Sequence, residues 1–298
     1  MSGPDAVTVS AHAKVNLLLR VLAREATGFH GLETLLCLVS LADELVAERR
    51  DGTDVTIDVH GADVGSASDN LAVRAAHLVL EATGRRFGVH LRLTKRIPAQ
   101  AGLGGGSSDA AAALTAVNLL AGAPVPRHEL LQIGARLGSD VPFFVTTAPL
   151  ALAWGHGERL LRLPPLRAAP ALLVTPAEPV ATATAFGWVD AAQQTLGRRG
   201  AIALDLEALA TWGSIGRLAG NDFESAVFPR LPAVRAAFEA LAATGPLCCR
   251  MTGSGSTLVG VYRSARDRDD AIDQLGRRHG VLTPVETLAS PPAAPIVA

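Results

Sequence analysis

The sequence predicts a mixed α/β protein of two domains. Its 298 residues, 49% of them hydrophobic, are enough for two ordinary cores. Strand-like and helix-like segments alternate through the first half, and the pattern restarts after the turn-rich stretch "TTAP" that ends at Pro149. We therefore expect one domain over residues 1–149 and a second over residues 150–298.

The first half is expected to contain three strands and three helices. Alternating or continuous apolar patterns are typical of strands, and they occur at 7–22, 53–60 and 88–97. Apolar residues at helical spacing predict helices at 69–84, 109–120 and 127–138. Asp69 or Asn70 can cap the first of these helices, and Gly84 can end it.

The second half shows fewer clear elements. Strand patterns occur at 150–154 and 170–177, and a helical pattern at 231–245. Residues 248–262, "CCRMTGSGSTLVGVY", fit either a strand, a turn and a second strand or a strand, a turn and a helix. The last ten residues or so, "ASPPAAPIVA", are expected to form a poorly ordered tail.

Composition excludes several classes of function. The 27 basic and 28 acidic side chains are balanced and form no Lys/Arg block, so we expect no nucleic-acid partner. We found no targeting or membrane-spanning segment. The three cysteines are Cys37 and the pair Cys248–Cys249, and they form no CxxC motif. This pattern favours a location in the reducing cytoplasm.

A glycine cluster lies directly before the helical run "DAAAALTAVNLL" that begins at Asp109. Ordering each glycine costs roughly 0.5–1 kcal/mol relative to alanine, so a cluster indicates a demand on the backbone. A flexible linker is the plain alternative. A glycine loop that opens into a helix can instead bring backbone N–H groups and the positive helix end to an anion, so the pattern favours a phosphate site.

The common phosphate loops do not fit this cluster. A Walker A loop needs a lysine before its Ser/Thr, but Gly106 is followed by Ser107 and Ser108. The dinucleotide fingerprint counted from Gly102 fails at Ser107. The sequence has no "HRD" or "DFG" triplet of a protein kinase, no HExxH zinc motif and no GxSxG elbow of a hydrolase.

The segment "PAQAGLGGGSSDAA" resembles the phosphate loop of the GHMP kinases. "AHAKVNLLLRV", "GFHGLETLL", "LGSDVPFF", "GNDFE" and "MTGSGSTLVGVY" follow the family order and are similar to one branch in particular, the 4-diphosphocytidyl-2-C-methyl-D-erythritol kinases. The resemblance extends from about Ala11 to Tyr262. It implies an α+β, two-layer GHMP kinase fold. Its first domain would be an ATP-binding domain like domain 2 of ribosomal protein S5, and its second would be ferredoxin-like.

The resemblance also implies catalytic residues. Lys14 and Asp140 are charged residues in apolar surroundings, which by themselves fit either an ion pair or a functional pair. By resemblance, Asp140 is the general base for the substrate hydroxyl and Lys14 steadies the nucleophile and the developing charge. Asn16 is assigned to the substrate site beside them.

ATP and Mg²⁺ are the cofactors that the resemblance implies, and no protein metal ligand is assigned. Lys95 on its own fits a solvated lysine at a strand end, and Asp109 fits either a Mg²⁺ contact or an acid that stabilises the helix dipole. The residues expected to hold ATP form the loop and the adenine site, namely Pro98, Ala99, Gln100, Ala101, Gly102, Leu103, Gly104, Gly105, Gly106, Ser107, Ser108, Asn70, Leu71 and Lys95.

The acceptor site implied by the resemblance is a cytosine pocket made by Phe29, His30 and Phe186. Aromatic rings can stack on a base while the imidazole reads its edge. The alternative is two core phenylalanines and a surface histidine. The family commonly has tyrosine where this chain has Phe29, so stacking is retained and a hydroxyl is lost. Segment 190–218 matches the family poorly.

The implied reaction is ATP-dependent phosphorylation of the 2-hydroxyl of 4-diphosphocytidyl-2-C-methyl-D-erythritol, with no nucleic acid or membrane partner, by a monomer or homodimer. Another GHMP kinase, for homoserine or mevalonate, is the alternative within the enzyme class. The second alternative, outside the enzyme class, is a nucleotide- or sugar-binding relative without catalytic activity. That relative would lack the base or the loop, whereas Lys14, Asp140 and the loop are all present.

Overall fold

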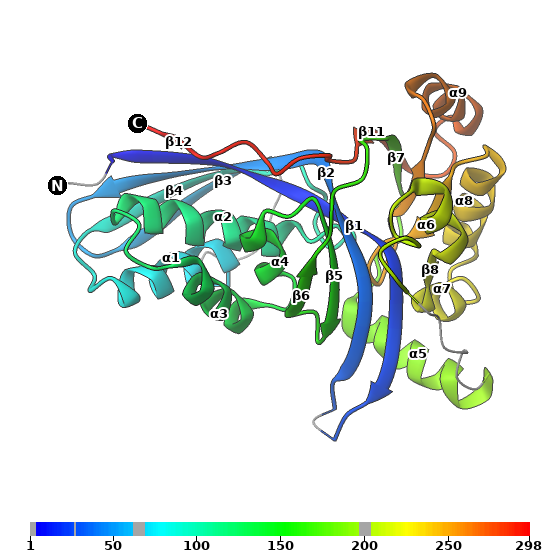
Figure 1. Cartoon of the computed structure of the whole chain (residues 1–298), viewed down its shortest axis with the longest axis horizontal. Coiled ribbons are helices and arrows are strands. Elements are labelled where there is room, and N and C mark those ends of the chain that lie inside the picture. Colours follow the sequence, from blue (N-terminus) through cyan, green and yellow to red (C-terminus); the bar gives the residue numbers. More distant parts are fainter. Residues whose placement is uncertain (1–3, 27, 62–68, 197–203) are drawn as a thin grey trace.

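The computed structural model describes residues 4–26, 28–61, 69–196 and 204–298. Two sheets organise these residues (Figure 1). The larger one has eight strands with the central order β12-β1-β2-β4-β3, and the smaller one has four strands in the order β11-β7-β10-β9.

The two longest strands of the larger sheet pair with each other. Strand β1 (Ala6–Arg24) and strand β2 (His30–Arg50) pair antiparallel over most of their length. Strands β4 (Gly88–Thr94) and β3 (Val55–His60) extend the sheet beyond β2. The expected strands at 7–22, 53–60 and 88–97 are therefore confirmed, whereas β2 was not expected.

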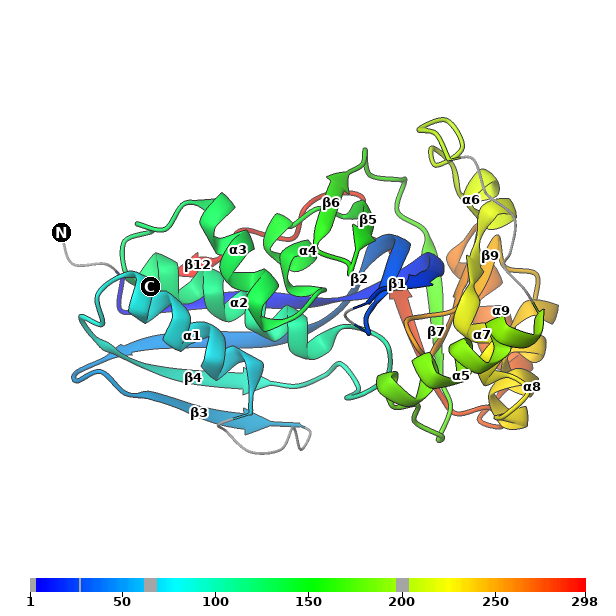
Figure 2. The same ribbon diagram turned by 90° about the horizontal axis from the view of Figure 1, so that it is seen from below.

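Four helices cover one face of the larger sheet, as Figure 2 shows. They are α1 (Leu71–Ala82), α2 (Gly105–Leu120), α3 (Arg127–Leu137) and α4 (Val141–Thr146). The side chain of Asn70 accepts a hydrogen bond from the backbone N of Ala72, so Asn70 is the N-cap of α1. Alanines dominate the buried face of α2, which lets this helix pack closely against α1 and β1.

The smaller sheet has the ferredoxin-like strand order. Its strands are β7 (Pro170–Thr175), β9 (Cys248–Met251), β10 (Leu258–Val261) and β11 (Val281–Glu286). All neighbours are antiparallel, and the first and third strands in chain order are central. Residues 248–262 therefore form a strand, a turn and a strand, the first of the two alternatives.

Helices of the second half surround this sheet. They are α5 (Thr182–Leu196), α6 (Trp212–Leu218), α7 (Asp222–Val227), α8 (Pro232–Ala243) and α9 (Ala265–Leu275). Only α8 was expected from the sequence. The poorly matching segment 190–218 is described except for residues 197–203, which lie outside the described residues.

Besides β12, at the end of the chain, three strands that follow Pro149 join the larger sheet among the described residues. Strand β5 (Leu150–Gly155) pairs with β2, β6 (Arg159–Arg162) pairs with β5, and β8 (Gly220–Asn221) pairs with β1. The division at Pro149 remains a proposal, and the first sheet reaches past it in the sequence.

The expectation of an unstructured C-terminal tail was wrong. Strand β12 (Ile296–Val297) pairs antiparallel with Val7 and Thr8 of β1, and the backbone N of Ala298 donates to the carbonyl of Ala6 at 3.0 Å. Residues 289–298 carry few large apolar side chains, but their end satisfies the backbone groups at the edge of β1.

The core runs continuously from one half of the chain to the other. Side chains in the middle of β1, such as Val15 and Leu17, belong to one buried cluster with Val259 and Val261 of β10. Further along the same strand, Leu19 and Val21 pack in a cluster with Leu172 of β7. Strand β1 therefore contributes to cores in both halves.

Candidate active site

One large cavity lies between the two halves. Its volume is about 1360 Å³, and its lining comes from β1, β2, the loop before α2, the start of α4, α5 and the turn after β9. Every residue that the sequence assigned to the site lines this cavity except Ser108. The cavity is large enough for a nucleotide together with a second substrate.

The glycine loop that precedes α2 has the backbone geometry its composition predicted. Gln100, Gly102 and Gly104 have positive φ angles of 54°, 75° and 72°. A Cβ atom on Gly102 would lie 2.3 Å from the carbonyl oxygen of Thr252, so only glycine fits there. The linker interpretation is therefore wrong, because the loop is packed against the second half of the chain.

Helix α2 begins at Gly105, earlier than the expected Asp109, and its N-cap Gly104 provides no side-chain cap. The first N–H groups of a helix have no partner within it, so this uncapped start can bind an anion. Ser107 lines the cavity. The Ser108 hydroxyl instead donates to the carbonyl of His12 at 2.7 Å, so Ser108 anchors the helix to β1.

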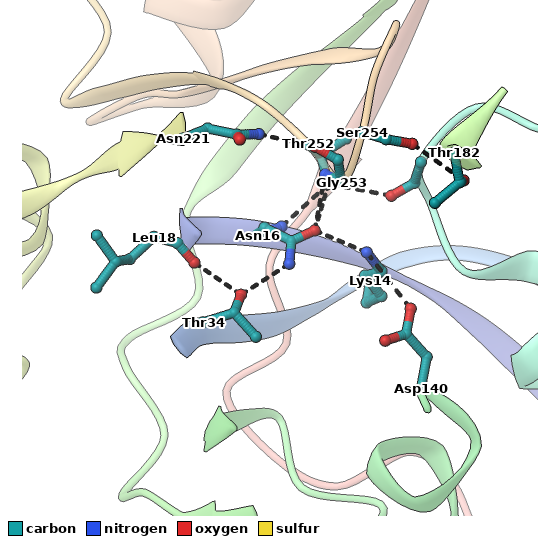
Figure 3. Close-up of polar contacts among 11 residues, drawn as sticks. Lys14, Asn16, Leu18, Thr34, Asp140, Thr182, Asn221, Thr252, Gly253 and Ser254 are labelled. Carbon is teal, nitrogen blue, oxygen red and sulfur yellow. Dashed lines mark hydrogen bonds and ion pairs between the residues drawn. The ribbon is translucent and has the colours of Figure 1, made fainter. Parts of the chain in front are cut away.

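Lys14 and Asp140 both line the cavity and contact each other. Lys14 Nζ lies 3.6 Å from Asp140 Oδ2, and it donates a hydrogen bond to Asn16 Oδ1 at 2.7 Å (Figure 3). Residues 14 and 16 share one face of β1, and shifts in the β1–β2 register flank both positions. Asp140 is the N-cap residue of α4 but makes no capping bond with its side chain, so its carboxylate remains directed at Lys14.

Asn16 ties this pair to the second half of the chain. Its Oδ1 accepts from the backbone N of Gly253 at 2.8 Å, and its Nδ2 donates to Thr34 Oγ1 at 2.8 Å. Asn221, in the "GNDFE" segment, donates from Nδ2 to the carbonyls of Met251 and Gly253. The turn after β9 is thereby held against β1, as Figure 3 shows.

Lys95 is buried, so its interpretation as a solvated strand-end lysine was wrong. Its Nζ donates to Asp43 Oδ2 and, at 2.7 Å, to Asp109 Oδ2. Burial raises the pKa of Asp109 to about 7, and the Lys95 charge offsets part of that rise. Asp109 Oδ1 is buried and has no hydrogen-bond partner among the described residues. Asp109 therefore pairs with Lys95 through Oδ2, and Oδ1 keeps no hydrogen-bond partner among the described residues.

The aromatic residues expected at the acceptor site line the same cavity. Phe29 is 64% exposed, and its ring lies 5.3 Å from the ring of His156. His30 is buried and stacks on Phe186 at 5.1 Å between ring centroids. The alternative of two core phenylalanines and a surface histidine was wrong, since Phe29 is the exposed member and His30 the buried one.

Sequence reasoning missed several residues that line the same cavity. Arg24, His156, Thr182 and Asp190 were not selected. Thr182 lies in the segment 180–186, "VATATAF", from which only Phe186 was chosen, and the other three lie in segments without a distinctive motif. Asp190 Oδ1 lies 2.6 Å from Nε2 of His30, from a position 160 residues away in the sequence. Only the fold brings these two residues together.

The described residues contain no cluster of three or more His, Cys, Asp or Glu side chains that could hold a metal ion. Among the helices of the described residues, none is long and apolar enough to cross a membrane.

Comparison with known proteins identifies the family. Residues 70–147 match the GHMP kinases N terminal domain, and residues 205–282 match the GHMP kinases C terminal model. A 4-diphosphocytidyl-2-C-methyl-D-erythritol kinase of Solibacter usitatus is 41% identical over 277 residues, which is 89% of this chain and 84% of the relative. The chain belongs to the 4-diphosphocytidyl-2-C-methyl-D-erythritol kinase family.

Further members of this kinase family match over most of the chain. The kinase of Pelobacter propionicus is 36% identical over 95% of this chain and 99% of its own length. A crystal structure of 4-(cytidine 5'-diphospho)-2C-methyl-D-erythritol kinase has a TM-score of 0.78 at 35% identity, covering 94% of this chain and 98% of that one. Homoserine kinase from Cytophaga hutchinsonii shares the fold, with a TM-score of 0.72 at 20% identity over 99% of this chain and 98% of its own.

Proposed function

We propose that this protein transfers the γ-phosphoryl group of ATP to the 2-hydroxyl group of 4-diphosphocytidyl-2-C-methyl-D-erythritol. The observation that carries the proposal is the position of Lys14 and Asp140. Their 3.6 Å contact lines the same cavity as the glycine loop and the rings of Phe29 and Phe186, which we call the aromatic wall. Family membership supports the same activity.

Asp140 is the general base in this proposal. Phosphoryl transfer to an alcohol needs the two substrates in line, the charge on the transferred group neutralised and the hydroxyl proton accepted. The side chain of Asp140 is 35% exposed, so a hydroxyl in the cavity can reach its carboxylate. Lys14, fixed by Asn16, then lies beside the oxygen that loses its proton and stabilises the charge there.

ATP binds along the glycine loop and the start of α2. The backbone N–H groups of Gly105, Gly106 and Ser107 hold phosphate oxygens at the uncapped helix end. Asn70 and Leu71, at the start of α1, form the adenine side of the cavity together with Lys95. Because Lys95 is already paired with two carboxylates, it contributes by supporting the loop as well as by lining the site.

The oxygen donors near the loop fit Mg²⁺, which prefers a few protein oxygens and keeps most of its water. Ser107 and the unpartnered Oδ1 of Asp109 are the residues that would hold it, directly or through water. When bound with ATP, Mg²⁺ supplies charge neutralisation on the phosphates.

The acceptor lies on the other side of Lys14 and Asp140, with its base against the aromatic wall. Phe29 offers an exposed face for stacking, and His30 offers a ring nitrogen for the base edge. The partners are thus two small molecules. A cytoplasmic location remains a proposal from cysteine usage.

An ADP-release assay tests the proposed function. The purified protein is supplied with ATP, Mg²⁺ and one acceptor at a time: 4-diphosphocytidyl-2-C-methyl-D-erythritol, homoserine, mevalonate or galactose. We expect ADP release above background with the first acceptor only. Release with homoserine or mevalonate instead would assign the chain to a different kinase, and release with none would favour a binding protein.

A further inference from the structure

His30 and Asp190 form a side-chain pair, of which the proposed function uses only His30 and gives Asp190 no role. The Nε2 atom of His30 lies 2.6 Å from Asp190 Oδ1, and the His30 side chain is only 5% exposed. Asp190 comes from α5, in the segment that resembles the family least. Both residues line the cavity.

The surroundings fix the orientation of the imidazole ring. Phe186 stacks on it with an interplanar angle of 16°, and Phe223 supports Phe186 edge-on with ring centroids 5.0 Å apart. On the carboxylate side, Arg24 Nη1 lies 3.7 Å from Asp190 Oδ2, so the second oxygen also faces a partner. With the ring plane held by Phe186 and one nitrogen held by Asp190, the ring has a single orientation.

That contact decides which nitrogen carries the proton. A carboxylate is only an acceptor, so the neutral His30 ring must donate from Nε2. The other nitrogen, Nδ1, then has a free lone pair and is an acceptor. It makes no hydrogen bond within the described part of the chain.

We propose that Asp190 is a specificity-determining residue, which holds His30 as the Nε2–H tautomer so that Nδ1 accepts a hydrogen bond from a base with an exocyclic amino group. Cytosine presents such a donor, whereas uracil presents a carbonyl oxygen at the same position. A lone pair facing a carbonyl is unfavourable, so the pair selects cytidine over uridine. This inference rests on the proposed function, because it assumes that the base lies against His30.

Asp190 acts through His30 and is therefore a positioning residue. A purely structural role, in which Asp190 only anchors α5 to the start of β2, is the alternative. The two roles differ in a measurable way, since loss of an anchor weakens binding of any base equally. Loss of tautomer control instead removes the preference between two bases.

The first test measures the tautomer in the wild-type protein. ¹⁵N-detected NMR of the imidazole nitrogens, at about pH 8 where free imidazole is neutral, distinguishes Nε2–H from Nδ1–H rings. The His30→Gln variant assigns the signal. We expect His30 in the Nε2–H form, and an Nδ1–H ring would overturn the proposal whether or not any Asp190 variant folds.

The second test measures binding of cytidine diphosphate and uridine diphosphate by calorimetry, with ADP present to occupy the glycine loop. We expect the wild-type protein to prefer cytidine diphosphate by roughly tenfold, the effect of one hydrogen bond in a desolvated site. Asp190→Asn can donate or accept, so it frees the tautomer and should bring the preference close to unity. Asp190→Glu retains the carboxylate and should restore part of the preference.

Asp58→Asn is the matched control. Asp58 is on the outer strand β3, away from the cavity, and its Oδ2 lies 3.5 Å from Nε2 of another histidine, His90 on β4. The control should retain the preference for cytidine diphosphate. Equal loss of both affinities in Asp190→Asn, or an unchanged ratio, would overturn the role of Asp190 and leave the proposed function intact. A wild-type protein that binds neither nucleotide would overturn both.

Discussion

Lys14 Nζ lies 3.6 Å from Oδ2 of Asp140 while the same nitrogen is held by Asn16 at 2.7 Å. The lysine is buried and the aspartate is partly open to the cavity. One side of the ion pair is therefore fixed by the protein, and the other side is free to meet a hydroxyl group. Loss of either charge should affect the rate more than the fold.

Asp140→Asn should lower turnover by about 10²–10⁴, the usual range for a general acid or base. Asparagine keeps the shape of the side chain but cannot accept the proton, and it leaves the loop and the aromatic wall in place. ATP binding, measured by calorimetry, should persist. A folded variant that phosphorylates the acceptor at a near-normal rate would show that Asp140 only pairs with Lys14.

Lys14→Met combined with Asp140→Asn should be little worse than the poorer single variant. Both groups act on one hydroxyl and one transition state, so their effects should not add. The measurement is kcat for the two single variants and the double variant. Fully multiplicative losses would indicate that the two side chains act at separate steps.

Gly104→Ala should weaken ATP binding strongly. Gly104 has φ of +72°, and a Cβ atom there would lie 2.9 Å from the Phe144 ring and 3.0 Å from Lys14 Cγ. Gly122→Ala is the control, because Gly122 also has a positive φ, +85°, but a Cβ atom there would meet no atom within 4 Å. Calorimetric ATP affinity should fall only in the first variant. Equal affinities would show that the loop does not bind phosphate.

Phe29→Ala should raise the KM of the acceptor by an amount equivalent to about 1–3 kcal/mol, the usual value of base stacking, and leave the KM of ATP nearly unchanged. Since Phe29 is 64% exposed, stability should change little. Leu161→Ala, at a half-exposed residue of β6 outside the cavity, is the comparison. Similar damage to both Michaelis constants would indicate a general packing defect.

Asp109 should make the protein without nucleotide less stable as the pH rises from about 4 to about 7. Burial raises the pKa of Asp109 to about 7, whereas an unfolded aspartate has a pKa of about 3.9. In this pH range the Asp109 carboxyl binds its proton more tightly in the folded state than in the unfolded state. The stability that this proton binding contributes is lost as the carboxyl loses its proton. Asp109→Asn cannot titrate, so its free energy of unfolding in urea should decline less with pH. Equal slopes for the two proteins would contradict this assignment.

The sequence was informative where a segment's structure depends on its own residues. The Asn70 cap and the glycine loop were predictable because cap and turn chemistry is local. Strand β2 was not predicted. Residues 35–39 are all apolar, and a short continuous apolar run fits a buried strand and a buried helix equally well. Helix α2 begins at Gly105, which helix propensity does not favour, and a Cβ atom at Gly105 would lie 3.0 Å from Ile97 Cγ2 and 3.3 Å from Lys95 Nζ, so the start of the helix is closely packed.

The sequence pattern could not predict which site residues from distant parts of the chain lie next to each other. Lys14 and Asp140 were selected through family resemblance, and their proximity follows only from the packing of α4 near β1. Asp190 could not be selected, because an aspartate in a helix without a motif resembles any solvated acid. Its partner His30 lies at the start of a strand in the other half of the chain.

Strand β1 carries Lys14 for one side of the cavity and, two residues on, Asn16, which binds Thr252 and Gly253 of the other half. The residues that hold the Lys14–Asp140 pair in place therefore come from both halves of the chain. Chimeras that join the first half of one family member to the second half of another should often fold and yet work poorly. Exchange between relatives should succeed only when β1, the turn after β9 and Asn221 come from the same parent, so these segments are expected to be inherited together.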